Sequence, residues 1–325
     1  MVGAVKERTS PFLKWVGGKS QLLHVLSRLI AKKSLTYYEP FLGGGAIFFH
    51  FADRRRFRKA VLNDSNPELI NCYEVVKDRL PELLQRLDTF KQDSDWNTKP
   101  YFEHIRAQRL SDPVEQAART VYLNRTCFNG LYRTNRAGEF NAPFGKYDNP
   151  QLYNLVNITA CSETLQRFAT LRVGDFSEAV ADAQAGDLVY FDPPYVPLSK
   201  TSSFTSYTGE FGVDQQISLA QLFQELFDRG VIVVQSNSDT PFVRELYEAF
   251  DLHVVEAKRS VNSKGDKRGE VDELVIVGQP KDLKIDVAAV SYGPDVFPLE
   301  CADCGTLYSS AEIVCVECGS ADVKE

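Results

Sequence analysis

Hydrophobic residues recur three and four positions apart near the start of the chain, at positions 22, 23, 26, 29 and 30 within residues 18–33. This spacing predicts an amphipathic helix. The next segments predict a strand, a helix, a strand and a helix, in the order TYYEP (36–40), AIFFHF (46–51), KAVLND (59–64) and NPELINCYEVVKDRL (66–80). Asn66 suits the cap of the last helix and Pro67 its first position. Such alternation predicts a parallel sheet with helices on both faces.

A middle segment interrupts this alternation. Residues 80–123 show helical patterns without a strand signal, and residues 124–150 are rich in Asn, Gly and Arg, which is typical of an ordered loop or hairpin. The alternation then returns. Strands are expected in TLRVGD (170–175), DLVYFDPPY (187–195), VIVVQSN (231–237), LHVVEA (252–257) and ELVIVG (273–278), and helices at 215–230 and 240–250. The pattern therefore predicts one α/β domain, residues 1–70 and 151–280, with a helical insert at 71–150.

Composition supports a packed globular protein, because 43% of the 325 residues are hydrophobic and 25% are charged. The net charge of -7 argues against binding to nucleic acid, but residues 279–325 hold three lysines and nine acids. Residues 51–59 carry five basic side chains and one acid, and residues 99–147 carry eight and four. Local charge governs attraction to phosphate, so nucleic acid stays open as a partner.

The sequence also predicts the compartment in which the protein works. No run of about 18 apolar residues occurs, which excludes a membrane-spanning helix. The first residues, MVGAVKERTSPFLKW, show no secretory signal. We expect a cytoplasmic, nucleoid-associated protein that acts as a monomer.

The first candidate site is EPFLGGG (39–45), where a strand is followed by a glycine turn and a helix. Glycines allow a ligand to approach the backbone closely. Asp64 lies 21 residues after Gly43, at the end of the next strand. An acid about 20 residues after such a turn is placed to bind ribose hydroxyls. The turn is not GxGxxG, so the pattern favours a nucleoside over a pyrophosphate. A plain strand–helix turn is the alternative.

The second candidate site is DPPY (192–195), which follows the apolar strand LVYF. Two prolines fix an extended backbone and remove two N–H donors. The Asp192 carboxylate and the Pro193 carbonyl are then acceptors for an exocyclic amine, and Tyr195 offers a ring on which a base can stack. A surface turn is the alternative. In FLKWVGGK (12–19), Trp15 and Lys19 taken alone suit a core residue and a solvated cap.

These segments together resemble Dam-type DNA adenine-N6 methyltransferases. The resemblance covers about residues 10–278 and rests on six motifs in the family's order, FLKWVGGK, EPFLGGG, VLNDSNPELIN, LNRTCFNGLYRTNRAGEFNAPFG, VYFDPPYVPLS and VDELVIV. DPPY alone is shared with other amino-methyltransferases. The resemblance implies a Rossmann-like S-adenosylmethionine-dependent methyltransferase sheet, with the insert as the target-recognition region. It also implies methyl transfer to N6 of a flipped adenine in double-stranded DNA, commonly within GATC.

Residue roles follow from the same resemblance. The catalytic motif is Asp192, Pro193 and Tyr195. The implied cofactor-binding residues are Trp15, Lys19, Glu39, Phe41, Gly43, Gly45, Asp64, Asp175, Phe176 and Asp192. The implied DNA-binding residues are Lys14, Phe128, Asn129, Leu131, Arg133, Pro143 and Tyr147. Arg133 matches a position that reads guanine, and Leu131 suits a thymine methyl. Phe128 stands where bacterial members often have Tyr, so it keeps the stacking face and loses the hydroxyl.

A cysteine cluster follows a proline-containing linker at 281–298. Two CxxC pairs, CADC and CVEC, place Cys301, Cys304, Cys315 and Cys318 within 18 residues. This spacing predicts a zinc ribbon at 299–325 with a structural zinc ion. Free or disulfide-bonded cysteines are the alternative. The ribbon lies outside the usual family pattern, and its negative charge favours a structural or protein-contact role over phosphate binding.

Other functions remain open at this stage. One alternative is methylation of another amine, such as cytosine N4, an RNA adenine or a protein glutamine. Another is a DNA-binding regulator that has lost catalysis, although DPPY and the glycine turn are both intact. A zinc nucleobase deaminase is excluded, because no HxE motif lies near the cysteines.

Overall fold

The protein is described here by a computed structural model. It describes residues 9–15, 17, 19, 22–30, 34–135, 138–196, 211–258 and 270–280, with three short strand segments at 299–301, 307–308 and 323–324.

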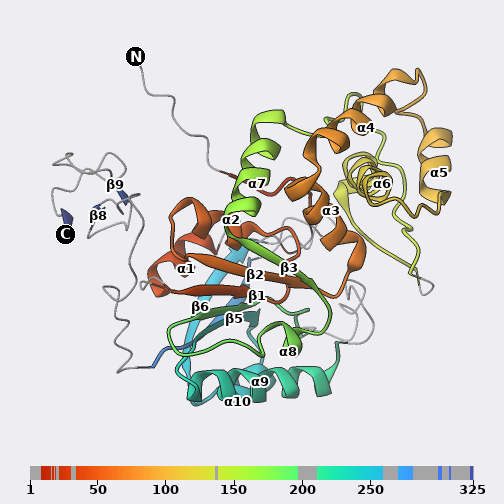
Figure 1. Ribbon diagram of the computed structural model, residues 1–325. Coiled ribbons are helices and arrows are strands. Elements are labelled where there is room, and N and C mark those ends of the chain that lie inside the picture. Colours follow the sequence, from red (N-terminus) through yellow and green to blue (C-terminus); the bar gives the residue numbers. More distant parts are fainter. Residues whose placement is uncertain are drawn as a thin grey trace.

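The centre of the fold is a seven-stranded sheet (Figure 1). Its strands are β1 (Thr36–Glu39), β2 (Lys59–Asp64), β3 (Ala169–Val173), β4 (Leu188–Phe191), β5 (Ile232–Ser238), β6 (Asp251–Lys258) and β7 (Glu270–Gly278). They lie in the order β3-β2-β1-β4-β5-β7-β6. β7 runs antiparallel to β5 and β6, and the other neighbouring strands are parallel. The predicted α/β sheet is confirmed.

Helices cover both faces of this sheet, as the alternating pattern predicted. The helices outside the insert are α1 (Leu23–Leu29), which precedes β1, and α2 (Ala46–Asp53), α3 (Pro67–Asp78), α7 (Leu155–Phe168), α8 (Phe176–Ala179), α9 (Val213–Asp228) and α10 (Pro241–Leu246). In Figure 1, α1, α2 and α7 lie above the sheet and α9 and α10 lie below it. The predicted first helix spans only Leu23–Leu29 of the expected residues 18–33, several of which lie outside the described residues.

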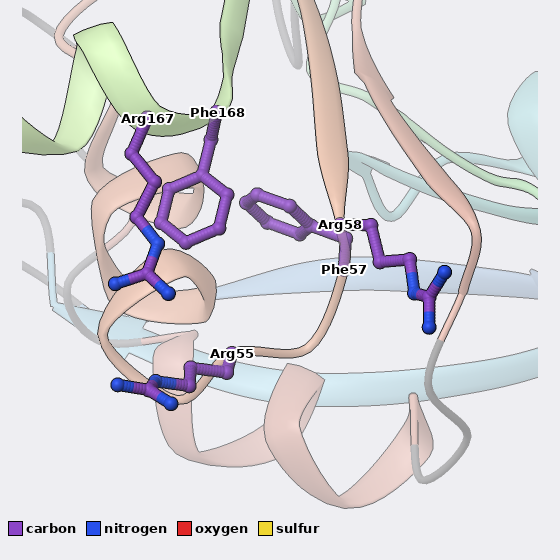
Figure 2. Close-up of a pocket in the computed structure, with 5 residues that line it drawn as sticks. All are labelled: Arg55, Phe57, Arg58, Arg167 and Phe168. Atoms are coloured by element: carbon purple, nitrogen blue, oxygen red, sulfur yellow. The ribbon is translucent and has the colours of Figure 1, made fainter. Parts of the chain in front are cut away.

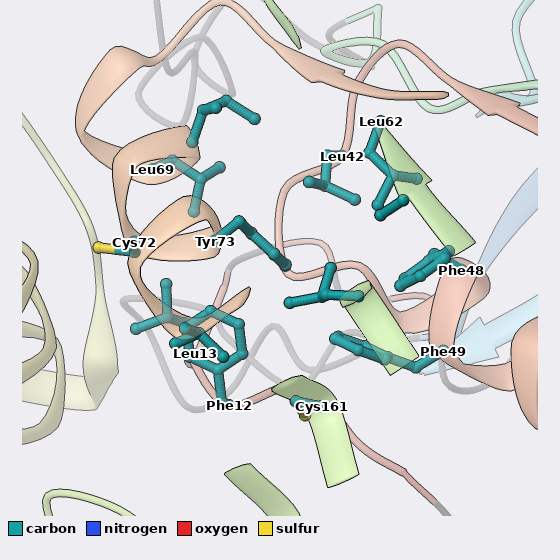
Figure 3. Packing of buried hydrophobic residues seen from close by; sticks show 14 of the residues in the cluster. Phe12, Leu13, Leu42, Phe48, Phe49, Leu62, Leu69, Cys72, Tyr73 and Cys161 are labelled. Carbon is teal, nitrogen blue, oxygen red and sulfur yellow. The ribbon is translucent and has the colours of Figure 1, made fainter. Parts of the chain in front are cut away.

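Successive side chains of β1 and β4 point into two different hydrophobic cores, one on each face of the sheet. On β1, Tyr37 points into one apolar cluster and Tyr38 into the other. On β4, Tyr190 and Phe191 divide in the same way. This is the two-residue period of a strand that is buried on both faces. The larger cluster contains Tyr73 of α3, which packs with Leu42, Phe48 and Phe49 (Figure 3).

The insert contains α4 (Leu80–Gln92), α5 (Lys99–Ala107), α6 (Pro113–Thr126) and the short η1 (Phe128–Gly130). Thr98 and Asp112 cap the starts of α5 and α6 through their side chains. The segment after α6 is a loop joined by two isolated bridges, Cys127 to Phe144 and Thr134 to Phe140. The larger core continues into the insert through side chains such as Phe102 and Tyr122, so the insert is packed against the sheet-covering helices.

Two further observations complete the fold. Strands β8 (Leu299–Cys301), β9 (Leu307–Tyr308) and β10 (Val323–Lys324) form a small antiparallel sheet in the order β10-β8-β9. Within the described ranges, none of the helices combines the length and apolar character needed to cross a membrane.

Candidate active site

The two candidate motifs lie side by side because of the strand order. From β1 the chain continues to β2 on one side, whereas β4, its other neighbour, is followed by β5 on the opposite side. In open α/β sheets, ligands bind at the carboxyl ends of the strands where the order reverses in this way. The glycine turn after β1 and the Asp192 loop after β4 both lie at that point, since Tyr37 pairs with Leu188 in parallel register.

The glycine turn is tied to the end of β2 through Asp64. The Gly43 N–H donates to Asp64 Oδ2 at 3.0 Å, and the Asn66 N–H donates to Oδ1 at 3.0 Å. Burial raises the pKa of Asp64, and the two N–H donors oppose that shift. The carboxylate therefore has a fixed orientation, and each oxygen keeps lone-pair capacity for a further donor.

The glycines of this turn make room for the protein's own aromatic side chains. Gly43 and Gly45 have φ values of +50° and +69°, in the left-handed region that glycine favours. A Cβ at Gly43 would lie 2.9 Å from Trp15 Cδ1, and a Cβ at Gly45 would lie 2.9 Å from the Tyr73 hydroxyl. Tyr73 also donates to the Gly43 carbonyl at 3.1 Å. The expected close approach of a ligand to these glycines stays a prediction.

An aromatic cluster flanks the same edge. The Phe41 and Phe176 rings are stacked, with centroids 5.4 Å apart and an interplanar angle of 25°. Phe211 contacts both rings, at 5.6 Å from Phe41 and 5.8 Å from Phe176. Asp175 precedes this cluster and caps α8 by accepting the Ser177 N–H at 2.8 Å. The structure thus brings Phe41 and Phe176 together, and it adds Phe211, which sequence reasoning missed.

Asp192 is held by two donors at one carboxylate oxygen. Lys19 Nζ lies 3.1 Å from Oδ1, and Ser236 Oγ donates to the same oxygen at 3.0 Å. Behind Ser236, the Tyr190 hydroxyl lies 2.9 Å from Ser236 Oγ. Burial raises the pKa of Asp192, and the Lys19 ammonium is the main influence that lowers it. Lys19 is therefore an electrostatic partner of the catalytic candidate, not a solvated cap.

Tyr195 is fixed at both its ring and its hydroxyl. Lys19 Nζ lies 4.4 Å from the ring centroid, and the hydroxyl donates to Glu273 Oε2 at 3.1 Å. Burial raises the pKa of Tyr195 well above its usual value, so the hydroxyl stays protonated as a donor. Gln216 Nε2 donates to the Pro194 carbonyl at 2.9 Å. The Asp192–Val196 loop is therefore clamped from α9 and β7.

Glu39 lies beneath this site and is 2% exposed. The Tyr37 hydroxyl donates to its Oε2 at 2.8 Å. Burial is the main cause that raises the Glu39 pKa well above the usual range, and the Asp192 charge adds to the shift. Glu39 therefore belongs to a buried polar pair at the end of β1.

The predicted DNA-binding residues gather on one exposed loop surface. Lys14 Nζ lies 5.1 Å from the Tyr147 ring centroid, and the Asn129 N–H donates to the Tyr147 hydroxyl at 3.0 Å. The Phe128 N–H donates to the Pro143 carbonyl at 2.8 Å, and the Phe128 side chain is 50% exposed. The Phe128 ring therefore lies outside the core packing.

Arg133 lies on the same loop and is oriented by Asn141. Its Nε donates to Asn141 Oδ1 at 2.7 Å, and Nη2 donates to the Asn141 carbonyl at 3.2 Å. Leu131 is half-buried. Trp15 stacks on Tyr132 at 5.0 Å and 23°. One short segment therefore reaches three parts of the site. Lys14 lies at this loop surface, Trp15 lies at the glycine turn, and Lys19 lies beside Asp192.

The cysteine cluster gives no metal geometry. Cys301 ends β8, whereas Cys304, Cys315 and Cys318 lie outside the described residues. Within the described ranges, no group of three or more His, Cys, Asp or Glu residues is arranged to hold a metal ion.

Comparison with known proteins identifies the family. The sequence model of the D12 class N6 adenine-specific DNA methyltransferases matches residues 15–261. The chain belongs to this family. It is therefore a DNA methyltransferase specific for adenine.

Relatives of this D12-class methyltransferase align with the chain over nearly their whole length. A type II methyltransferase of Lactococcus lactis subsp. cremoris, M1.LlaDCHI, is 43% identical over 82% of this chain and 94% of its own. M.MjaIII, a type II methyltransferase of Methanocaldococcus jannaschii, is 39% identical over 82% of this chain and 98% of its own. The DNA adenine methylase of Escherichia coli is 36% identical over 84% and 97%.

Sequence reasoning missed the supporting residues of this D12-class site. Ser236, Asn237 and Ser238 are buried polar residues at the end of β5, where an apolar strand is expected. Ser236 reaches Asp192, and Asn237 Oδ1 accepts the Val196 N–H at 3.2 Å. A run of polar residues ending a buried strand is the signal that points to them, because buried polar groups need partners.

Proposed function

We propose that this D12-class enzyme transfers the methyl group of S-adenosylmethionine to N6 of an adenine flipped out of duplex DNA, within GATC. The observation that carries the proposal is the strand order. It sets the Asp64-anchored glycine turn beside the Asp192 loop at one edge of the sheet.

The residues at this edge fit the methyl donor. Asp64 keeps acceptor capacity for ribose hydroxyls, and the stacked Phe41 and Phe176 rings suit an adenine. Glu39 and Trp15 border the same turn. S-adenosylmethionine supplies an electrophilic methyl group on a sulfonium centre.

The Asp192 loop fits the target amine. Lys19 and Ser236 both engage Asp192 Oδ1, and we propose that Oδ2 and the Pro193 carbonyl accept the two N–H bonds of adenine N6. An aromatic amine is a poor nucleophile because its lone pair is delocalised, and two acceptors favour a tetrahedral nitrogen. Tyr195 stacks on the base. Flipping costs a few kcal/mol, on the order of one unstacking and unpairing event. The main catalytic device is then positioning of the nitrogen, methyl carbon and sulfur.

The proposed GATC preference rests on Arg133 and Leu131. An exposed guanidinium aimed by Asn141 suits bidentate contact with guanine O6 and N7. Arg133→Gln should lower kcat/KM on GATC by roughly 10-fold to 100-fold, since such a contact is worth about 1–3 kcal/mol. The loss should shrink on duplexes altered at that guanine. An equal loss on every duplex would remove Arg133 from base readout.

The decisive test measures methyl incorporation from labelled S-adenosylmethionine into three matched duplexes. One contains GATC, one contains GATC already N6-methylated on both strands, and one has GTTC with its complement. Label in the first alone establishes reaction, atom and site. Label in all three refutes GATC. No label with donor binding intact favours RNA or another amine.

A donor-binding measurement separates the enzyme from a DNA-binding protein without catalysis. Calorimetric titration of S-adenosylmethionine should show one site, and Asp64→Ala should abolish it because the ribose acceptor and the anchor of Gly43 are both lost. Asp64→Asn is the matched variant that keeps an acceptor oxygen. Undiminished binding by Asp64→Ala would contradict the assignment.

We also propose that Cys301, Cys304, Cys315 and Cys318 hold one structural zinc ion. The CxxC spacing supports this, together with the short antiparallel strands in the same segment. Four thiolates are the donor set of closed zinc sites. Metal analysis of the full chain should give one zinc per protein. Cys304→Ser with Cys318→Ser should remove it, whereas Cys72→Ser, a buried cysteine elsewhere, should not.

A further inference from the structure

A basic cavity lies at the opposite edge of the sheet from the candidate active site. It has a volume of about 170 Å³ and is lined by Arg55, Phe57, Arg58, Arg167 and Phe168 (Figure 2). Arg58 precedes β2 and Phe168 precedes β3, so the cavity lies at the amino ends of these strands. Asp64 is the last residue of β2 and lies six residues after Arg58. At about 3.3 Å per residue, roughly 20 Å separate the two sites.

The cavity has an aromatic floor and charged walls. The Phe57 and Phe168 rings meet edge to face with centroids 5.6 Å apart, and Phe57 is buried. The Arg167 guanidinium lies 5.2 Å from the Phe168 ring centroid. In Figure 2 the guanidinium groups of Arg55 and Arg167 lie toward one side of the two rings, whereas the Arg58 side chain extends toward the other side. The two rings offer no amide or carboxylate acceptor to the guanidinium groups of Arg55 and Arg167.

The backbone holds Arg55 at this cavity. Arg55 has a φ of +48°, which is uncommon for a residue with a side chain. Its N–H donates to the Ala52 carbonyl at 3.0 Å, which closes the turn after α2. The neighbouring acid, Asp53, accepts the Thr9 N–H and hydroxyl, each at 2.8 Å. Within the described ranges, no carboxylate pairs with Arg55 or Arg167.

We propose that this cavity binds a backbone phosphate of a second DNA segment, away from the segment being methylated. Guanidinium forks match phosphate oxygens in geometry and charge. The cavity is smaller than the roughly 300–1,000 Å³ of small-molecule sites, which suits a single phosphate group. The proposal depends on the enzyme acting on DNA and not on the GATC assignment.

The stiffness of DNA is the reason why the phosphate bound in the cavity must belong to a second DNA segment. A duplex in the recognition loop meets the carboxyl edge of the sheet, whereas the cavity opens at the amino edge. DNA has a persistence length of about 150 base pairs, so a short duplex does not wrap around the protein to reach it. A contact with a distant segment would keep the enzyme on long DNA between methylation events.

A bridging experiment tests the proposal with the full chain. A duplex of about 14 base pairs is fixed to beads, the protein is bound, and capture of a second, fluorescent duplex is measured at low salt. The variant is Arg55→Gln with Arg167→Gln. The charge-matched control is Arg229→Gln with Arg244→Gln, at the ends of α9 and α10. Melting temperatures check that each protein is folded.

We expect the cavity variant to capture the second duplex at least about fivefold less, because two phosphate contacts are lost. Its affinity for the bead-bound duplex should stay within about twofold of the unaltered protein, and the control should bridge normally. Capture unchanged in the cavity variant overturns the proposal, as does absence of bridging by the unaltered protein. Equal loss of both binding events would assign the cavity to the target duplex. Inorganic phosphate could also raise the melting temperature of the unaltered protein and not that of the cavity variant. If this happens and no bridging is seen, the ligand is free phosphate and not DNA.

Discussion

Asp192 illustrates how a single residue depends on partners that are remote in the sequence. Its Oδ1 accepts from Ser236, whose hydroxyl also contacts Tyr190. Ser236→Ala should lower kcat by roughly 10-fold to 100-fold, since a hydrogen bond to a charged group is worth about 1.5–3 kcal/mol. Tyr190→Phe removes only the outer hydroxyl and should cost less. Steady-state rates at saturating DNA measure both, and an equal loss in the two variants would contradict a direct role for Ser236.

Lys19 should set the pH at which Asp192 becomes active. The proposed chemistry needs the carboxylate, so activity rises as the pH increases through the Asp192 pKa. Burial raises that pKa and Lys19 lowers it. Removing the ammonium with Lys19→Met therefore moves the acid side of the kcat/KM profile to higher pH. The measurement is the pH at the midpoint of this acid limb, which does not depend on how much activity the variant keeps. Lys14→Met is the matched control. An unmoved limb would show that another group governs it.

At the scale of elements, the turn between β1 and α2 combines two constraints on one glycine. Gly45→Ala would place a side chain in left-handed backbone and bring its Cβ to 2.9 Å from the Tyr73 hydroxyl. Backbone strain of this kind costs about 1–3 kcal/mol. Urea unfolding should show that loss, and adding Tyr73→Phe should recover only the part caused by the hydroxyl. A double-mutant cycle measures the split. If the two substitutions change the free energy of unfolding additively, the contact between the new Cβ and the Tyr73 hydroxyl costs no stability.

Elements with a clear local pattern were predicted, and those that depend on pairing were not. The strand before Asp192 is an apolar run, and the strand before the glycine turn contains two tyrosines. Both end next to chemically distinctive residues, so both could be predicted from the sequence. Helix α7 (Leu155–Phe168) was missed, because its first turn exposes Leu155 and Val156 and its β-branched residues weaken the helical signal. The antiparallel position of β7 between β5 and β6 has no local signature.

The same distinction applies to the site. Asp64 ends β2 and Asp192 directly follows β4, and they were predicted from the spacing between Gly43 and Asp64 and from the DPPY motif. Ser236 and Glu273 contribute because of strand register, in which Phe191 pairs with Gln235 and Ser238 with Glu273. These registers bring Ser236 to Asp192 and Glu273 to the Tyr195 hydroxyl. A hydrogen-bond partner that is fixed by pairing between distant strands leaves no spacing rule in the sequence.

At the scale of the whole molecule, the insert and the sheet-covering helices share one core. A single apolar cluster contains Phe48 of α2, Tyr73 of α3, and Phe102 and Tyr122 of the insert. The backbone carbonyl of Trp96 accepts the Tyr122 hydroxyl at 2.6 Å, which ties the α4–α5 connection to α6. Elements that share a core should unfold together, because neither part can bury its apolar surface alone.

The chain's two tryptophans allow that expectation to be tested, since Trp15 lies at the glycine turn and Trp96 in the insert. Trp96→Phe leaves Trp15 as the only reporter, and Trp15→Phe leaves Trp96. Urea unfolding of the two variants, each followed by its remaining tryptophan and by circular dichroism, should give coincident transitions within each protein. An insert that unfolded separately would make the Trp96 signal change before the helical signal. That outcome would mean that the shared core does not couple the insert, with its proposed role in target recognition, to the proposed active site. Phe102→Ala would then weaken DNA binding without lowering the stability reported by Trp15.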